Sequence, residues 1–328
     1  MIVLVGDVGG TNTRLALAEI VDDRPRIIHE QRLSSTAIPS LGDAIRRYLQ
    51  ANTTPISAAG FGVAAPISAG ECAGPNLPWS FSAAELADAT GLLTVTLVND
   101  FSALGAGIPF TAAQDLLTLQ LGKAVRRGPL AVIGAGTGLG EGFLMWDQNH
   151  YTVRASEGGH GTFAPQTERE WKLCQYLQSR FGHVSAERIL SGAGLYAVYR
   201  FLADVEHHPE SSAVAEEMQR SMPQAVITRH AENGTDALCG ETVDLFLSIY
   251  GAQAGNLALT VLATGGVYIA GGVASYIQKR LQNGVFMQAF LHKGRMENML
   301  TKIPVHLVTS PHTALWGAAA LAARGFNP

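Results

Sequence analysis

The chain has 328 residues, of which 47% are hydrophobic and 15% are charged, and its 23 basic and 27 acidic side chains leave a formal charge of −4. At roughly 100–200 residues per domain this length predicts about two domains, and the composition excludes a disordered chain. The slightly acidic balance, with basic residues scattered along the chain, argues against nucleic-acid binding.

No feature of the sequence predicts export or a disulfide framework. It begins with the apolar run 2–5, without the basic segment and cleavage site of a secretory signal. The three cysteines, Cys72, Cys174 and Cys239, lie far apart and form no metal-binding pair. We therefore expect a cytoplasmic protein.

One uncharged run, 245–278, is long enough to suggest a membrane span. Polar Gln253 and Asn256 interrupt it, however, and Gly265 and Gly266 break it. A core helix followed by a buried strand is the better interpretation, so we expect no membrane contact.

The first part of the chain alternates strands with helices. The predicted elements are strands at 2–7, 13–20 and 26–33, a helix at 39–50, and strands at 58–64 and 94–98. The first two strands form a hairpin with a glycine-rich turn, and Ser40 is a candidate N-cap of the helix. Such alternation is typical of a largely parallel or mixed sheet.

The same scheme of strand, glycine-threonine turn and strand restarts at Pro129. The predicted elements are strands at 130–135 and 142–146, helices at 168–181, 194–204, 211–222 and 237–262, strands at 267–270 and 305–308, and a closing helix at 313–324. The sequence therefore predicts a two-domain α/β fold with mixed sheets flanked by helices, and a domain boundary between 109 and 130.

The first candidate site is the turn after the first strand. It reads Gly6, Asp7, Val8, Gly9, Gly10, Thr11 and Asn12. A turn so rich in glycine can aim several backbone N–H groups at phosphate oxygens. Asp7 would repel phosphate, so its expected role is to hold the hydration shell of Mg²⁺. The alternative is a tight hairpin with a capping aspartate.

A second glycine turn, 134–140, contains Gly136, Thr137 and Gly138. Its spacing and the strand that follows disfavour a dinucleotide-binding fingerprint, and no P-loop motif occurs in the chain. Each turn alone is a weak signal, but a pair of glycine-threonine hairpins predicts a phosphate clamp that closes from both sides.

Asn99 and Asp100 end a predicted buried strand, where ligands gather in α/β sheets. Asp100 can accept the proton of a hydroxyl that attacks phosphorus, and Asn99 can orient a neighbouring hydroxyl. The alternative is that either residue only caps the helix that follows.

Three later polar residues, Glu157, His160 and Glu187, could bind vicinal hydroxyls, because carboxylates accept and imidazole donates or accepts hydrogen bonds. The alternatives are a zinc ligand at His160, which lacks partners at ligand spacing, and a surface ion pair at Glu187. Gly271 and Gly272 would let an adenine ring approach the backbone closely, although packing explains them nearly as well.

Five segments of the sequence resemble those of bacterial ATP-dependent glucokinases, the hexokinase branch of the actin/Hsp70-like ATPase fold. They are residues 5–12, 98–101, 134–140, 157–160 and 183–192, within a match that runs from residue 3 to about residue 320. The last two are far more specific than the glycine turns. The related ROK group has a zinc-binding cysteine cluster that this sequence lacks, which favours the metal-free branch.

This resemblance implies an actin-like, ribonuclease H-like fold with a small domain (1–109 plus 311–328), a large domain (110–310) and a cleft between them. It implies that the first turn, with Gly136, Thr137 and Gly138, holds the ATP phosphates, and that Gly271 and Gly272 border adenosine.

The resemblance also assigns the sugar-binding and catalytic roles. Asp100 would be the base for the 6-hydroxyl of glucose, and the other hydroxyls would be bound by Asn76, Asn99, Glu157, His160 and Glu187. The implied partners are glucose, ATP and a second copy of the chain in a homodimer. The alternatives are a kinase for another hexose or amino sugar and, from a different class, a nucleotide-driven binding protein.

Overall fold

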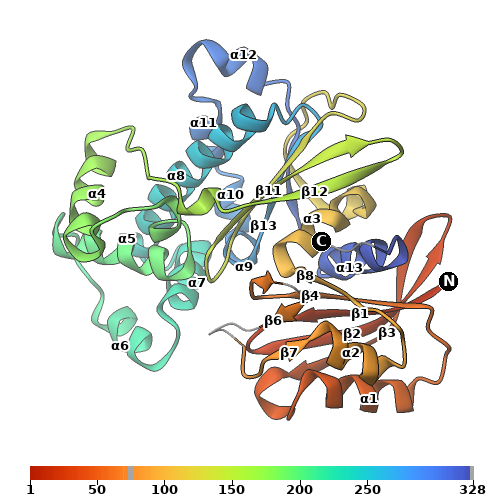
Figure 1. Cartoon of the computed structure of the whole chain (residues 1–328). Coiled ribbons are helices and arrows are strands. Elements are labelled where there is room, and N and C mark those ends of the chain that lie inside the picture. Colours follow the sequence, from red (N-terminus) through yellow and green to blue (C-terminus); the bar gives the residue numbers. More distant parts are fainter. Residues whose placement is uncertain (69, 73–76, 326–328) are drawn as a thin grey trace. The chain divides into compact units, whose positions relative to one another are not determined.

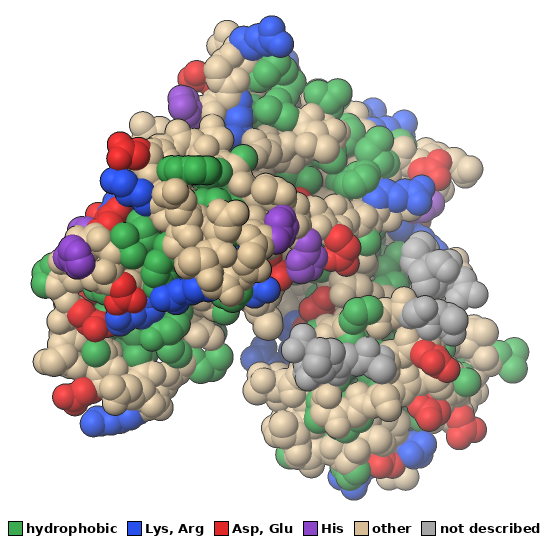
Figure 2. Space-filling model, turned by 60° about the vertical axis from the view of Figure 1, so that its left-hand side comes forward, with side chains coloured by type: hydrophobic (Ala, Val, Ile, Leu, Met, Phe, Trp, Pro, Cys, Tyr) green, Lys and Arg blue, Asp and Glu red, His purple; other side chains and the backbone are tan. Residues whose placement is uncertain are grey.

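The computed structural model describes residues 1–68, 70–72 and 77–325, which form two compact units (Figure 1). Unit 1 consists of Met1–Asp115, Asp147–Ala155 and Ser310–Pro328. Unit 2 consists of Leu116–Trp146 and Ser156–Thr309. Figure 2 shows acidic and basic side chains interspersed over the face that it draws.

Unit 1 contains a five-stranded sheet in the order β3-β2-β1-β4-β8. Its strands are β1 (Ile2–Val8), β2 (Asn12–Val21), β3 (Arg24–Ser34), β4 (Ala58–Val63) and β8 (Thr96–Asn99). β1 and β2 form the predicted antiparallel hairpin, whereas β1, β4 and β8 run parallel. A small second sheet joins β5 (Ile67–Ser68), β6 (Glu71–Cys72) and β7 (Phe81–Ser82).

Helices cover both faces of the five-stranded sheet. They are α1 (Leu41–Ala51) and α2 (Ala83–Thr90) on one face, and α3 (Asp100–Gly107) and α13 (Thr313–Ala323) on the other (Figure 1). Successive residues of β1 alternate between the faces: Leu4 packs in the core with α1, and Val3 and Val5 pack with α13. Gly60 allows α13 to approach β4, because a Cβ there would lie 2.5 Å from the Ala318 carbonyl oxygen.

The six-stranded sheet has the order β12-β11-β10-β13-β14-β9. Its strands are β9 (Leu116–Gln120), β10 (Leu130–Ala135), β11 (Leu139–Asp147), β12 (His150–Ser156), β13 (Gly266–Ala270) and β14 (Val305–Val308). β10, β13 and β14 run parallel, and β10 and β11 form the second predicted hairpin. Both halves of the chain therefore repeat one scheme.

The remaining helices belong to unit 2. They are α4 (Glu168–Phe181), α5 (Gly192–Asp204), α6 (Ser212–Arg220), α7 (Pro223–Asn233), α8 (Ala237–Val261), α9 (Gly272–Tyr276), α10 (Gln278–Leu281), α11 (Val285–Leu291) and α12 (Glu297–Leu300). α8 is apolar on most sides and lies in the core, as expected for a helix that other elements surround. Its Tyr250 hydroxyl donates to the Ile133 carbonyl oxygen of β10 at 3.2 Å. Within the described ranges, no helix has both the length and the apolar content that crossing a bilayer requires.

Candidate active site

The first group of predicted site residues lies at one edge of the unit 1 sheet. The register aligns Val8 of β1 with Val63 of β4, and Val63 with Asn99 of β8. The carboxyl ends of these parallel strands therefore lie side by side. Because the glycine turn follows β1 and Asp100 follows β8, both predicted sites emerge from the edge of the sheet where α/β proteins bind ligands.

The turn after β1 is tight, and a residue from outside the motif fixes it. The Gly9 amide donates to the Asn12 carbonyl oxygen at 2.9 Å, and the Thr11 and Asn12 side chains are exposed. Buried Ser35 donates from its hydroxyl to the Gly9 carbonyl oxygen at 2.6 Å and from its amide to the Thr11 carbonyl oxygen at 2.9 Å. The turn thus presents its polar side chains on a fixed backbone.

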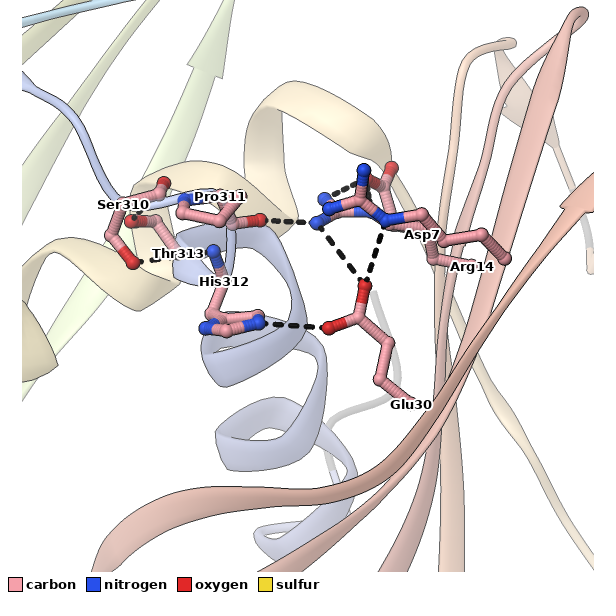
Figure 3. A network of polar contacts seen from close by, with 8 residues as sticks. Asp7, Arg14, Glu30, Ser310, Pro311, His312 and Thr313 are labelled. Atoms are coloured by element: carbon pink, nitrogen blue, oxygen red, sulfur yellow. Dashed lines mark hydrogen bonds and ion pairs between the residues drawn. The ribbon is translucent and has the colours of Figure 1, made fainter.

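Asp7, the predicted Mg²⁺ aspartate, forms an ion pair with Arg14 at 2.5 Å (Figure 3). The same guanidinium donates to the Pro311 carbonyl oxygen at 2.5 Å and lies 3.9 Å from the Glu30 carboxylate. Glu30 in turn contacts His312 at 2.8 Å. The network fixes the Asp7 carboxylate in place beside the turn.

Asn99 and Asp100 lie at the start of α3. The Asn99 side chain accepts a hydrogen bond from the Phe101 amide at 3.0 Å, so the capping role considered for this residue is confirmed. Asp100 Oδ1 accepts from the same amide at 2.8 Å. Burial raises the pKa of Asp100 to about 6, and the negative charge of nearby Asp7 acts in the same direction. Capping leaves the Asp100 carboxylate as a partly buried, unusually basic group.

A second group of predicted residues lies together in unit 2. His160 Nδ1 is 3.7 Å from Glu187 Oε1, and His160 Nε2 is 3.6 Å from Glu157 Oε2. The three side chains differ in exposure: 91% for Glu157, 62% for His160 and 30% for Glu187. The structure thus brings the predicted carboxylate–imidazole cluster together, with its polar atoms accessible to a hydroxylated ligand.

Backbone hydrogen bonds hold the two segments of this cluster against each other. The Phe163 amide donates to the Val184 carbonyl oxygen at 2.9 Å, and the Ala186 amide donates to the Gly161 carbonyl oxygen at 3.0 Å. These hydrogen bonds hold the segment after His160 against the segment before Glu187. This contact explains how residues nearly thirty positions apart in sequence form one cluster.

Glu187 also connects the cluster to the second glycine turn. Its Oε2 accepts a hydrogen bond from the Leu139 amide at 2.9 Å. A Cβ at Gly138 would lie 2.4 Å from the same oxygen, so the carboxylate approaches the turn only because residue 138 is glycine. The Gly136 carbonyl oxygen accepts from the Gly192 amide at the start of α5.

Gly271 directly follows β13. It lies at the same edge of the six-stranded sheet as the second glycine turn, which follows β10. The register pairs Gly134 with Ala270. Gly271 has a φ of +86°, and a Cβ there would lie 2.4 Å from the Ala135 carbonyl oxygen. Both its left-handed backbone and its close packing require glycine, so the packing role considered for this residue is confirmed.

Glu141 is a residue near the cluster that sequence reasoning missed. It is 4% exposed, and the Gln253 amide donates to its Oε1 at 2.8 Å. A Cβ at Gly158 would lie 2.3 Å from its Oε2, so Glu141 supports the segment between Glu157 and His160. Its sequence signal is an acidic residue within an otherwise apolar strand.

Asn76, a predicted sugar contact, lies outside the described residues. Across the described ranges, no three His, Cys, Asp or Glu side chains gather in a way that could hold a metal ion.

Solved structures with a similar fold include sugar kinases. A crystal structure of glucokinase from an Antarctic psychrotroph has a TM-score of 0.86 and 33% identity, covering 98% of this chain and 99% of that one. A ROK-family glucokinase from Streptomyces griseus has a TM-score of 0.66 and 20% identity, covering 99% and 100%. The chain is thus an α/β protein of the actin-like ATPase fold, the class that the sequence predicted.

The sequence comparisons narrow this class to one family. The Glucokinase family model matches residues 4–325. A glucokinase from Trichormus variabilis is 40% identical over 339 residues, covering 98% of this chain and 99% of the relative. The chain belongs to the glucokinase family and is an ATP-dependent glucose kinase.

Proposed function

We propose that this chain transfers the γ-phosphoryl group of ATP to the 6-hydroxyl of D-glucose, forming glucose 6-phosphate and ADP, with Asp100 as the catalytic base. Family membership supports the reaction. The observation that supports the assignment of the base is the partly buried Asp100 carboxylate, with a pKa raised to about 6, at the carboxyl end of β8.

Asp100 would accept the proton of the 6-hydroxyl as that oxygen attacks the γ-phosphorus. A carboxylate of raised pKa is a stronger base than an exposed aspartate, yet it remains ionised at neutral pH. Its hydrogen bond with the Phe101 amide fixes one oxygen, which leaves the other for the substrate. The sugar itself supplies the nucleophile, so this positioning accounts for much of the expected rate enhancement.

Asn99, Glu157, His160 and Glu187 would bind the other hydroxyls of glucose, together with Asn76. Hydrogen bonds to ionised carboxylates are roughly twice as strong as those between neutral groups. Two carboxylates flanking His160 therefore suit a polyol that offers several donors. The Streptomyces griseus relative was crystallised with glucose and AMPPNP, which is consistent with both proposed substrates.

The residues that would bind ATP are the turn from Gly6 to Asn12, Gly136 to Gly138, and Gly271 with Gly272. The second turn fits this role because a Cβ at Gly136 would meet open space, and because the Thr137 side chain is exposed. Asp7 fits a place near Mg²⁺, since its charge and that of Asp100 lie close together. When bound, Mg²⁺ supplies positive charge that neutralises the phosphates.

Coupled ADP release with glucose, mannose, fructose and no sugar tests the substrate. We expect turnover that depends on glucose, and release that is independent of sugar would refute the proposal. Asp100→Asn should lower kcat by about 10²–10⁴-fold. Asp88→Asn, an exposed aspartate on α2, is the matched control and should retain full activity. The proposal includes a two-domain division at the predicted boundaries, a cytoplasmic location and a homodimer. Sedimentation of the purified chain would test the homodimer.

A further inference from the structure

Unit 2 contains a cavity of about 400 Å³ that none of the predicted site residues lines. It lies between the start of α4, the middle of α8 and α11 with the residues that follow it. Its lining includes Glu170, Ser248, Ala252, Val285, Ala289 and Lys293. This volume lies in the range of pockets that hold small organic molecules.

A buried carboxylate forms one side of the cavity. Glu170 is only 4% exposed. Its Oε2 accepts a hydrogen bond from the Gln166 amide at 2.6 Å, while its own amide donates to the Thr167 hydroxyl at 3.2 Å. Its other oxygen, Oε1, receives no hydrogen bond from any described residue. This oxygen is accessible, not buried without a partner, so it can accept a hydrogen bond from a cationic or hydrogen-bonding ligand in the cavity.

An ammonium group forms another side of the cavity. The Lys293 stem lies on α8 at Gly255, where a Cβ would come within 2.8 Å of Lys293 Cε. Burial lowers the pKa of Lys293, and the charge of Glu170 opposes that shift. The two groups are close enough to interact electrostatically, yet in the part of the chain that the structure describes the Lys293 ammonium forms no ion pair or hydrogen bond. The Lys293 ammonium can therefore bind an anionic group of a ligand in the cavity.

Ala252, Val285 and Ala289 give the cavity an apolar part. The rest of the lining is polar and includes Gln288, His292 and Glu297. A dianion such as a phosphate ester would be repelled by Glu170, and a simple cation would be repelled by Lys293. A ligand that carries an ammonium group and a carboxylate on the same carbon can pair with both groups at once.

We propose that this cavity binds a small zwitterion of the α-amino acid class, with its ammonium group at Glu170, its carboxylate at Lys293 and its side chain on the apolar part. The site is separate from the glucose and ATP residues, so the proposal goes beyond the kinase activity. Lys293 contacts none of those residues in any interaction described above, so its replacement should leave kcat unchanged.

Isothermal titration calorimetry of the full chain against the common L-α-amino acids, without ATP, tests the proposal. We expect saturable binding of at least one amino acid, and binding at least tenfold weaker for the amine and the carboxylic acid that each carry only one of its charges. Binding of none, or equal binding of a one-charge analogue or of glucose, would overturn the proposal.

Lys293→Met should weaken this binding at least tenfold, because it removes the charge and keeps the length of the side chain. Lys302→Met, which replaces an exposed lysine, is the matched control and should bind normally. Glu170→Gln should weaken binding as strongly, with thermal unfolding measured to confirm that it folds. Unchanged affinity in Lys293→Met would exclude the assigned site even if kinase activity is normal.

Discussion

Replacing the proposed base should stabilise the protein while it lowers kcat. Asp100 is partly buried at the end of β8, and the loss of solvent there raises its pKa from 3.8 to about 6. This difference in pKa corresponds to about 3 kcal/mol of preference for the protonated form. The ionised carboxylate at neutral pH therefore lowers the free energy of unfolding, and Asp100→Asn removes that charge while keeping an oxygen for the Phe101 amide.

The sign of the effect depends on pH. Between pH 3.8 and about 6 the folded state holds more protons at Asp100 than the unfolded state does, so stability falls as pH rises. Above pH 6 the full penalty is present. Asp100→Asn should therefore raise the free energy of unfolding by up to about 3 kcal/mol at pH 8 and by close to zero at pH 3.

Urea unfolding at pH 8 and at pH 3, followed by tryptophan fluorescence, measures both values. Asp88→Asn should change stability by less than about 0.5 kcal/mol, because its carboxylate is exposed on α2. A gain that is the same at both pH values would show that burial of charge is not its cause. No gain at pH 8 would refute the partly buried, basic state of Asp100.

Three further predictions concern the same site. The kcat/KM for glucose should fall about tenfold per pH unit below about 6, because Asp100 must be ionised to accept a proton; a flat profile down to pH 5 would contradict this. Glu187→Gln keeps an oxygen for the Leu139 amide but loses the negative charge. The KM for glucose should therefore rise about tenfold in steady-state assays, and an unchanged KM would exclude the sugar contact. Ser35→Ala should lower the free energy of unfolding by about 1–3 kcal/mol in urea, because it leaves buried partners unsatisfied, whereas Ser34→Ala, at an exposed hydroxyl, should have little effect.

Sequence reasoning located the parts of the site that depend on local pattern. The two glycine turns follow strands whose apolar runs are visible in sequence, and β10 (Leu130–Ala135) begins and ends where it was predicted. Asn99 and Asp100 were identified because strand ends in α/β sheets carry ligands. These inferences required only the order of elements and the position of polar residues after each strand.

The supporting contacts depend on register, which the sequence does not reveal. Ser35 reaches the first turn because β3 pairs with β2, so that Ser34 lies opposite Asn12. Arg14 reaches Asp7 because the two residues are direct partners across the β1–β2 hairpin. A shift of one residue in either pairing would turn these side chains to the other face.

Among the helices that were not predicted, two have end signals that are visible in the sequence. α2 begins with a capping box between Ser82 and Glu85 and ends at Gly91 in the left-handed conformation. α7 begins with Pro223 and ends at Gly234. The cavity between Glu170 and Lys293 had no comparable signal, because its walls come from segments more than a hundred residues apart.

The packing of α13 on β1 has a consequence for biosynthesis. Leu315 and Ala318 fill the same core as Val3 and Val5, so one face of the unit 1 sheet is completed by residues that leave the ribosome after all of unit 2. Unit 2 can therefore acquire its core on the nascent chain while the part of this face that α13 covers is still exposed. Until translation ends, the apolar side chains of Val3 and Val5 lack their contacts with α13.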